Sequence, residues 1–351
     1  MTSEFGVYVH IPFCQHRCDY CDFATWTDRE GLMADYAAAC RREVVEADLP
    51  LATSVFFGGG TPSLLPAPLL VSILEVIPRQ DGAEVTVECN PETVTRPLLA
   101  TYRETGVNRL SFGVQSMQPA VLAALGRRHD PATVDRAVDW ARDAGFGSLN
   151  LDLIYGATGE SAADWVATLQ AALALGPEHL SAYALTVEPG TPLARDPARW
   201  PDDDDQADKY LVADDLLAAA GLSWYEISNW AKPGFECRHN RLYWDQGDYR
   251  GIGCAAHSHR RGRRWWNVRT PERYLELIGS GRSPGAGEEI LDADGRAREA
   301  LQLSLRTRKG VPASALPLAD PALDGLVTWR GGRVVLSPTG RLLANEVAAR
   351  L

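Results

Sequence analysis

The sequence has no long apolar segment and no export signal at its start. No run of about 18 apolar residues occurs, which is the length that a membrane-spanning helix needs. Residues 1–4, Met-Thr-Ser-Glu, have neither the basic residues nor the apolar stretch of a secretory signal. The 351 residues include seven cysteines, too few and odd in number for a disulfide scaffold. We expect a cytoplasmic protein with reduced thiols and no transmembrane segment, either free or peripheral to a membrane.

Positive charge is also scarce. Lys and Arg number 35 against 46 Asp and Glu, so the formal net charge is −11. An acidic chain gains no general attraction to phosphate backbones, and we expect no nucleic-acid partner. The one basic, aromatic-flanked run, residues 260–266, is interpreted as an exposed hairpin tip, with contact to carboxylates of a bound ligand or to a membrane surface as alternatives. Apolar residues make up 45%, which is typical of a soluble globular protein.

Short apolar runs alternate with amphipathic stretches along the first two thirds of the chain. The predicted strands are 5–11, 54–57, 84–89, 109–114, 148–154 and 179–187. The predicted helices are 32–48, 66–77, 95–105, 118–124, 132–145 and 161–175. Such alternation favours parallel strands with helical crossovers. We therefore predict an α/β fold, a partial (β/α)6 barrel of the TIM type, with its chemistry at the carboxyl ends of the strands.

The remaining chain is predicted to form further parts. We expect a core over residues 1–220, a connecting segment over 221–285 and a C-terminal module over 286–351. The pattern of the connecting segment is irregular and aromatic-rich from 222 to 275. A linker is expected at 284–287, a helix at 292–305, a hairpin at 326–336 and a last helix from 339. Helices with a short hairpin resemble a winged-helix module, so this module is expected to be α+β.

Three cysteines lie within eight residues. Cys14, Cys18 and Cys21 follow the first predicted strand as CxxxCxxC. Thiolates at this spacing select zinc or an iron–sulfur cluster. A closed zinc site needs a fourth ligand, for which His10 and His16 are the local candidates. Three thiolates on a four-iron cube instead leave one iron open to another ligand.

A glycine-rich segment, Phe-Phe-Gly-Gly-Gly-Thr-Pro over residues 56–62, follows the second predicted strand. It lacks the Lys-Ser/Thr pair of a Walker phosphate loop. Together with CxxxCxxC it resembles the radical S-adenosylmethionine (SAM) superfamily. The resemblance implies that Cys14, Cys18 and Cys21 hold a [4Fe–4S] cluster whose open iron binds SAM.

Further motifs resemble the branch of that superfamily that contains the oxygen-independent coproporphyrinogen III oxidases and their relatives. They are HIPFCxxxCxYCDF, ECNP at 88–91, SFGVQS at 111–116, LGRRH at 125–129 and NLDLIYG at 150–156. The resemblance implies a SAM site made by Tyr8, Tyr20, Gly59, Gly60, Thr61, Glu88, Gln115, Arg127 and Asp152. In it Arg127, or alternatively Arg128, would meet the SAM carboxylate, while the carboxylates and Gln115 would bond ribose hydroxyls or the ammonium group.

Two features separate the members of this branch. The oxidases carry a further cysteine two residues after the triplet, where this chain has Phe23. Residues 239–244 read His-Asn-Arg-Leu-Tyr-Trp, the HNxxYW motif of the haem chaperone (HemW) family. The resemblance implies a protein that binds haem, with His239 as a haem-contacting residue, and passes it to acceptor haemoproteins, including respiratory ones at the membrane.

Other interpretations stay open at this stage. One is the oxidase reaction, the radical decarboxylation of coproporphyrinogen propionates to vinyl groups, and another is radical SAM chemistry on a different substrate. A third is a zinc site made by Cys237, His239, Cys254 and His257. Whether the protein is an enzyme is left open, although Phe23 speaks against the oxidase reaction.

Overall fold

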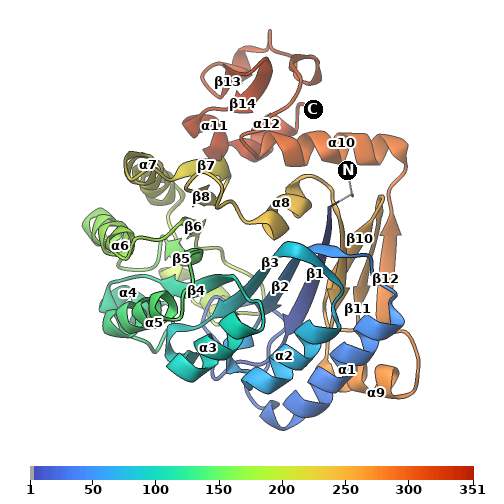
Figure 1. Ribbon diagram of the computed structural model, residues 1–351. Helices are drawn as coiled ribbons and strands as arrows, with labels where there is room; N and C mark the ends of the chain where they lie inside the picture. Colours follow the sequence, from blue (N-terminus) through green and yellow to red (C-terminus); the bar gives the residue numbers. More distant parts are fainter. Residues whose placement is uncertain (1–3) are drawn as a thin grey trace.

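The predicted parallel strands form the centre of a twelve-stranded sheet in the computed structural model of the protein, which describes residues 4–351 (Figure 1). Residues 1–3 lie outside the described residues. They belong to the segment from which we predicted that no export signal is present. The strand order is β12-β11-β10-β9-β1-β2-β3-β4-β5-β6-β8-β7. Strands β1 to β6 run parallel in chain order, and β9 joins β1 in parallel, whereas the outer strands pair antiparallel.

The strands of this sheet are short and apolar at its centre. They are β1 (Phe5–Ile11), β2 (Ala52–Gly59), β3 (Arg79–Cys89), β4 (Arg109–Gln115), β5 (Leu149–Tyr155), β6 (His179–Ala184), β7 (Ser223–Glu226), β8 (Asn229–Ala231), β9 (Asp248–Ile252), β10 (His257–Arg260), β11 (Arg263–Asn267) and β12 (Gly285–Ile290). A separate hairpin near the C-terminus consists of β13 (Val327–Arg330) and β14 (Arg333–Leu336).

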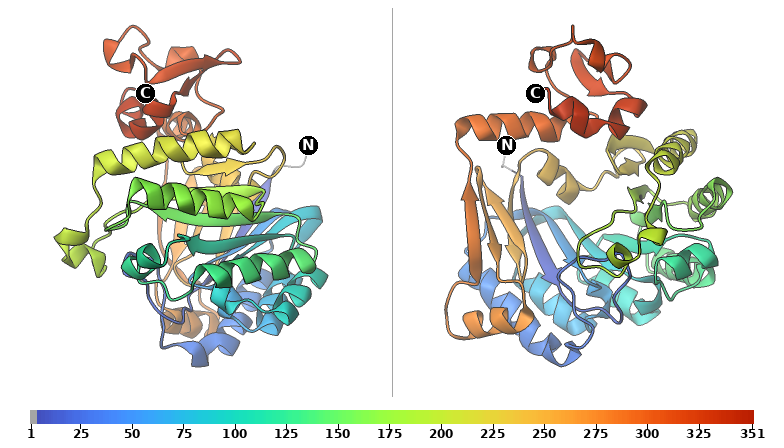
Figure 2. Two further views of the ribbon diagram at one scale, coloured as in Figure 1. Left: turned by 90° about the vertical axis from the view of Figure 1, so that its left-hand side faces the viewer. Right: turned by 180° about the vertical axis from the view of Figure 1, so that it is seen from behind.

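Helices follow the parallel strands and cover the outside of the curled sheet (Figure 2). They are α1 (Met33–Glu46), α2 (Ala67–Val76), α3 (Arg96–Glu104), α4 (Pro119–Ala124), α5 (Pro131–Asp143), α6 (Ala162–Ala174) and α7 (Asp203–Ala219). The later helices are α8 (Arg238–Trp244), α9 (Pro271–Gly279), α10 (Ala293–Leu305), α11 (Pro338–Leu342) and α12 (Ala344–Ala348). This arrangement confirms the partial α/β barrel.

The connecting segment is more regular in structure than in its sequence pattern. Residues 222–275, whose pattern is irregular, form β7 to β11 together with α8 and the first part of α9. The expected linker at 284–287 begins strand β12, which pairs with β11 at the edge of the sheet. These strands are stabilised by pairing with distant partners, such as β9 with β1, and that pairing leaves no local pattern in the sequence. The division of the chain at 220 and 285 stays a prediction, and the large sheet crosses both points.

The C-terminal residues have an apolar core of their own. Leu305, Val311, Leu336 and Val347 are among its buried side chains. The predicted hairpin at 326–336 is confirmed, whereas the single last helix is divided into α11 and α12 at Leu343. In Figure 1 these elements stand above the barrel beside the long helix α10.

A buried carboxylate ties α1 to the far side of the sheet. Glu43 is 3% exposed and accepts hydrogen bonds from the backbone N–H of Gly253 at 2.9 Å and from Tyr274 Oη at 2.7 Å. It also accepts bonds from Arg250 Nη2 and Asn267 Nδ2, both at 3.0 Å. One side chain therefore satisfies donors from β9, the loop after it, β11 and α9.

We predict that Glu43→Ala lowers the free energy of unfolding by roughly 3–5 kcal/mol, because several buried donors lose their only carboxylate. Urea unfolding of the cofactor-free protein measures this loss. Glu46→Ala is the matched control, since Glu46 on the same helix makes only an exposed pair with Arg42 and should cost about 0.3–0.5 kcal/mol. Equal losses in the two variants would contradict the assignment.

Candidate functional site

The cysteine loop leaves the end of β1 and is closed at its base by backbone hydrogen bonds. Trp26 N donates to Pro12 O at 2.8 Å, and Cys14 N donates to Trp26 O at 3.0 Å. Cys18 is buried, while Cys14 and Cys21 are half-buried. The loop between Pro12 and Trp26 therefore presents its three thiols from a fixed base.

The glycine-rich end of β2 packs directly against this loop. Gly60 N donates to Ile11 O and Thr61 N to Phe13 O, each at 2.8 Å. A Cβ at Gly60 would lie 2.6 Å from Phe13 O and 3.0 Å from Cys14 Sγ, so only glycine fits. The hydroxyl of Thr61 donates to Cys14 Sγ at 3.6 Å. Gly60 and Thr61 thus hold the first cysteine by shape and by a hydrogen bond.

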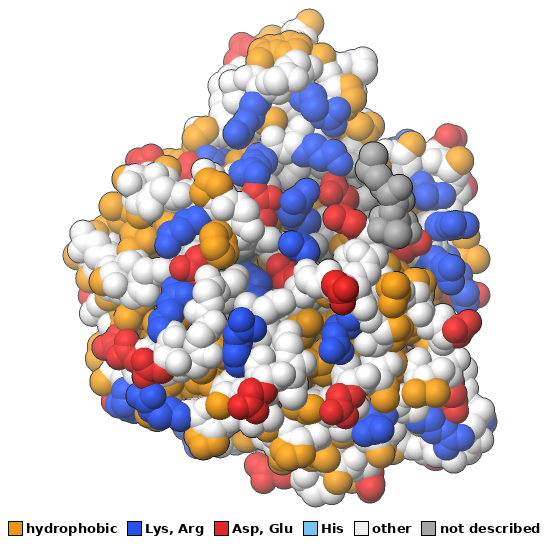
Figure 3. All heavy atoms as spheres, viewed as in Figure 1, with side chains coloured by type: hydrophobic (Ala, Val, Ile, Leu, Met, Phe, Trp, Pro, Cys, Tyr) orange, Lys and Arg blue, Asp and Glu red, His pale blue; other side chains and the backbone are white. Residues whose placement is uncertain are grey.

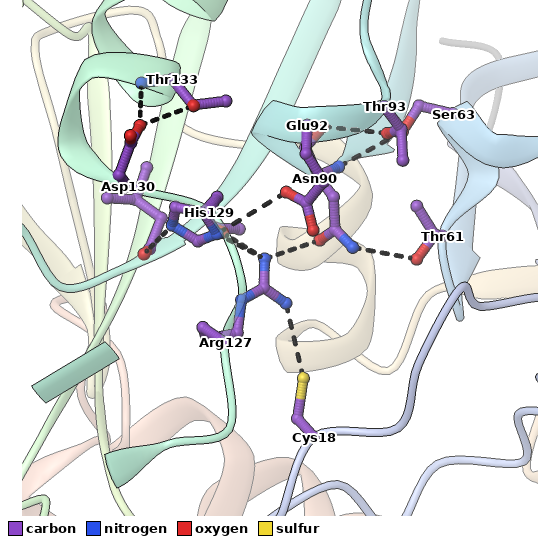
Figure 4. A network of polar contacts seen from close by, with 12 residues as sticks. Cys18, Thr61, Ser63, Asn90, Glu92, Thr93, Arg127, His129, Asp130 and Thr133 are labelled. Carbon is purple, nitrogen blue, oxygen red and sulfur yellow. Dashed lines mark hydrogen bonds and ion pairs between the residues drawn. The ribbon is translucent and has the colours of Figure 1, made fainter. Parts of the chain in front are cut away.

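Arg127 connects the cysteine loop to the ends of β3 and β4 (Figure 4). Its Nη2 donates to Asn90 Oδ1 at 2.9 Å and to Gly113 O at 2.8 Å, and its Nη1 donates to Cys18 Sγ at 3.6 Å. Asn90 Nδ2 in turn donates to Thr61 Oγ1 at 3.1 Å. The Nε atom of Arg127 is buried without a partner among the described residues. A fixed guanidinium with a free donor beside a cysteine suits an anionic group bound at the cluster.

We call the carboxyl ends of the parallel strands, together with the cysteine loop, the mouth of the barrel. Two of its residues, His10 and Gln115, bear on the ligands that the sequence predicts. Both ring nitrogens of His10 are engaged, Nε2 with Ala24 O at 2.9 Å and Nδ1 with Tyr8 Oη at 3.0 Å, so His10 has no free nitrogen for zinc. Gln115 has φ +65°, a left-handed conformation that costs a side-chain-bearing residue energy and often marks a functional position.

The protein residues fit an iron–sulfur cluster by their chemistry. Burial raises the pKa of Cys14 to about 11 and also raises the pKa of Cys21. Thiolates at this depth therefore need nearby positive charge, which Arg127 supplies and which the irons of a bound cluster would add. In the part of the chain that the structure describes, no group of three His, Cys, Asp or Glu side chains is already gathered for a metal ion.

A cavity of about 220 Å³ lies inside the barrel, deeper along the strands than the cysteine loop. It is lined by Tyr8, Phe56, Glu88, Arg109, Ser111, Asn150, Asp152, His179, Ser181, Tyr183, Asn229, Cys237, His239, Asn240 and Tyr243. We call it the inner cavity. The predicted site residues thus divide into a group at the mouth, with the cysteines, Thr61 and Arg127, and a group in the inner cavity.

Glu88 joins the two groups. Its Oε2 accepts a hydrogen bond from Gly59 N at 3.0 Å. Burial, with a smaller contribution from Asp152, raises the pKa of Glu88 to about 8. Asp152 accepts bonds from Ser111 Oγ at 2.6 Å and Asn150 Nδ2 at 2.9 Å, and burial is the main cause that raises its pKa. Both carboxyl groups face the inner cavity with acceptors that can meet hydroxyl or ammonium groups.

His239 forms part of the wall of the inner cavity. Its Nδ1 bonds Ser54 Oγ and its Nε2 bonds Tyr243 Oη, both at 2.9 Å, and its ring stacks on Phe56 at 5.4 Å between centroids. Burial lowers the pKa of His239 to about 3, so the ring is neutral. Both nitrogens are engaged, so binding iron would require one hydrogen bond to break.

The zinc alternative in the connecting segment does not form in the described residues. Cys237 Sγ donates to Glu84 at 3.5 Å, whereas Cys254 Sγ accepts from Tyr36 Oη at 3.4 Å on another side of the barrel. No metal-binding group that includes them is found within residues 4–351.

The basic run at 260–266 forms the turn and second strand of the β10–β11 hairpin, as interpreted from its sequence. Arg263 pairs with Glu288 and Arg264 with Glu289, so these charges are balanced.

Lys and Arg side chains gather instead below the C-terminal elements (Figure 3). A second cavity of about 300 Å³ there is lined by Tyr225, Glu236, Arg241, Trp244, Asp245, Thr307, Arg308, Lys309 and Arg330.

Comparison with known proteins agrees with this geometry. Residues 8–172 match the model of the radical SAM superfamily. A protein of Mycobacterium tuberculosis named heme chaperone HemW is 44% identical over 370 residues, which cover 99% of this chain and 95% of the relative. The heme chaperone HemW of Bacillus subtilis is 33% identical, with 97% of both chains covered. The chain belongs to the HemW family of radical SAM proteins.

The HemW family implies a [4Fe–4S] cluster and SAM. Among solved structures, coproporphyrinogen III oxidase (HemN) of Escherichia coli, described as a radical SAM enzyme, superposes with a TM-score of 0.86 at 25% identity. The match covers 99% of this chain and 89% of that enzyme. The fold is therefore shared between chaperone-named relatives and an oxidase, and function has to be argued from the site.

Sequence reasoning missed several polar residues of the inner cavity. Arg109 and His179 are the first residues of β4 and β6, and Asn229 lies in β8. A polar residue at the start of an apolar strand was the available signal, but it is also typical of a surface position. Tyr20 and Gln115 lie outside the lining of the inner cavity. No helix of the described residues is long and apolar enough to span a membrane.

We predict that the raised pKa of Glu88 makes stability pH-dependent. The folded protein keeps the proton to about pH 8, whereas the usual value is 4.5. Stability is therefore highest below the unfolded pKa and falls as the pH rises towards 8, by at most about 1.4 kcal/mol per unit.

Urea midpoints of the cofactor-free protein between about pH 5 and pH 8 test this dependence. Glu88→Gln keeps an acceptor for Gly59 and should flatten the profile. Parallel profiles for the two proteins would show that Glu88 ionises normally.

Proposed function

We propose that the protein is a haem chaperone that binds haem, a [4Fe–4S] cluster and SAM, and delivers haem to acceptor haemoproteins. The observation that carries this proposal is the match, over nearly the whole chain, to relatives named heme chaperone HemW. The aromatic Phe23, 62% exposed where the oxidases carry a further cysteine, supports the same choice.

In this proposal Cys14, Cys18 and Cys21 hold the cluster, and Arg127 receives the SAM carboxylate. The support for Arg127 is its unpartnered Nε beside Cys18. Bound together, the cluster and SAM supply one-electron cleavage chemistry. The chain's own residues bind and orient: Gly60 allows close approach to the backbone, and Thr61 donates a hydrogen bond to Cys14.

The remaining predicted residues act around SAM. Tyr8, Tyr20 and Gly59 would form its walls, and Gln115 would present its amide from the strained end of β4. Glu88 and Asp152 would accept from hydroxyl or ammonium groups. The proton that Glu88 retains at neutral pH lets it also donate a hydrogen bond.

His239 is proposed to contact haem through its imidazole ring. The ring is part of an aromatic wall with Phe56 and Tyr243 that suits a flat macrocycle. Acceptor haemoproteins, including respiratory ones at a membrane, are the proposed partners, and the cytoplasm, with peripheral contact to a membrane, is the proposed location.

A second candidate is the oxidase reaction on coproporphyrinogen propionates. The structural similarity to HemN of Escherichia coli favours it. Phe23 at the position of a further cysteine and the chaperone-named relatives favour the first candidate.

We expect alanine at Cys14, Cys18 or Cys21 to abolish the visible absorption of the cluster, because three thiolates are needed to hold it. Absorbance with iron and sulfide analysis after anaerobic reconstitution measures the loss. Cys89→Ala is the matched control, since Cys89 is a buried cysteine whose thiol donates to Val87 O and lies outside the loop. Full colour in a loop variant would refute the ligand assignment.

The two functions are separated by one anaerobic assay. Reconstituted protein with SAM and a reductant is given coproporphyrinogen III in one arm and haem in the other. We expect stoichiometric uptake of haem, transfer of this haem to an added apo-haemoprotein, and no vinyl porphyrinogen. Vinyl product formed over many turnovers would establish the oxidase instead.

A further inference from the structure

The inner cavity contains a buried arginine without a partner. Arg109 is 3% exposed and lies at the start of β4, on the wall of the cavity away from the cysteine loop. Its Nε is buried and unpaired, and no side-chain hydrogen bond or ion pair of Arg109 is found within residues 4–351. A desolvated guanidinium with unfilled donors is unfavourable, so its position indicates an acceptor that the chain itself does not supply.

The nearest carboxylates are occupied by other donors. Glu84 accepts from the backbone N–H groups of Arg238 at 3.1 Å and His239 at 3.2 Å. Asp152 accepts from Ser111 and Asn150. Burial is the largest single effect and lowers the pKa of Arg109. The combined attraction of Cys237, Glu84, Tyr225 and Asp152 at longer range outweighs it, so that this pKa is raised. The guanidinium is therefore charged but has no direct partner.

The surroundings of Arg109 favour an organic carboxylate. Hydroxyl and amide groups of Ser181, Asn229 and Asn240 lie on the same lining, while Tyr183 and Tyr243 add aromatic surface. Glu84 and Asp152 already act on Arg109 as acidic neighbours, so a multiply charged phosphate would be repelled more strongly than a single carboxylate. A volume of about 220 Å³ is below the roughly 300–1,000 Å³ of sites for whole drug-sized ligands. The cavity therefore suits one arm of a ligand.

We propose that Arg109 binds a carboxylate of the ligand at the inner end of the cavity. This inference rests on the proposed function for the identity of the ligand: in a haem chaperone, the carboxylate is a haem propionate. A propionate arm, and not the macrocycle, would then enter the barrel interior beside His239 and reach the guanidinium, while Glu88 and Asp152 would remain the contacts of SAM.

The first test needs no haem. Sodium propionate should raise the thermal midpoint of the cofactor-free wild-type protein above that in sodium chloride of equal ionic strength. Arg109→Gln should lose this difference, and Arg109→Lys, which keeps the charge with fewer donors, should retain part of it. Arg103→Gln on the exposed face of α3 is the matched control and should behave as wild type.

The second test compares haem with its dimethyl ester by anaerobic titration of the cluster-loaded protein. The wild-type protein should bind haem about tenfold more tightly than the ester, which is the effect of one hydrogen-bonded charge. Arg109→Gln should lower haem affinity by the same factor and leave ester affinity unchanged. Loss of affinity for both ligands alike would overturn the carboxylate assignment.

The outcomes separate the two proposals. A propionate effect that requires Arg109, without any uptake of haem, would retain the carboxylate site and refute the chaperone function. Haem uptake with no preference over the ester in any variant would retain the chaperone and refute the role of Arg109. If Arg109→Gln does not fold, the comparison of Arg109→Lys with wild type decides, and an unchanged propionate effect there overturns the proposal.

Discussion

Backbone hydrogen bonds hold the cysteine loop to the ends of β1 and β2, and the whole site depends on that attachment. The bonds between Trp26 and Pro12 and between Cys14 and Trp26 close the loop, while Gly60 and Thr61 bond it to the next strand. A soft cofactor can be bound at the mouth of a barrel only if its thiolates come from a fixed frame, because ordering a free loop would oppose binding. Hydrogen bonds from Thr61 through Asn90 to Arg127 then connect this fixed loop to the ends of β3 and β4.

Deeper than the mouth, the interior of this barrel is lined by polar side chains, whereas the interior of most TIM barrels is filled with apolar ones. Glu88 and Asp152 have raised pKa values, and Arg109 has no direct partner among the residues that the structure describes. Such groups lower the stability of the fold, so their presence in one cavity is more consistent with ligand binding than with structure alone. The same chain compensates elsewhere, for example through the fully bonded Glu43 between α1 and the sheet edge.

Sequence reasoning reached the parts of the structure that leave a local pattern. The alternation of apolar strands and amphipathic helices identified β1 to β6 and their helices, because each element buries one face at its own period. CxxxCxxC and the glycines near Gly60 pointed to the mouth of the site. The inner cavity was harder to predict because its contacts are not local: His239 bonds Ser54 across 185 residues, and β9 pairs with β1. Arg109 is also the first residue of a mostly buried strand, where nothing local in the sequence shows that it lines a cavity.

The central claim is that three cysteines on a fixed loop hold an iron–sulfur cluster in a protein that carries haem. The most direct measurement is a combined analysis of iron, acid-labile sulfide, zinc and haem in the wild-type protein after anaerobic purification and incubation with haem. The account predicts about four non-haem irons and four sulfides per chain, together with retained haem and no stoichiometric zinc. One zinc per chain with neither sulfide nor haem would contradict it.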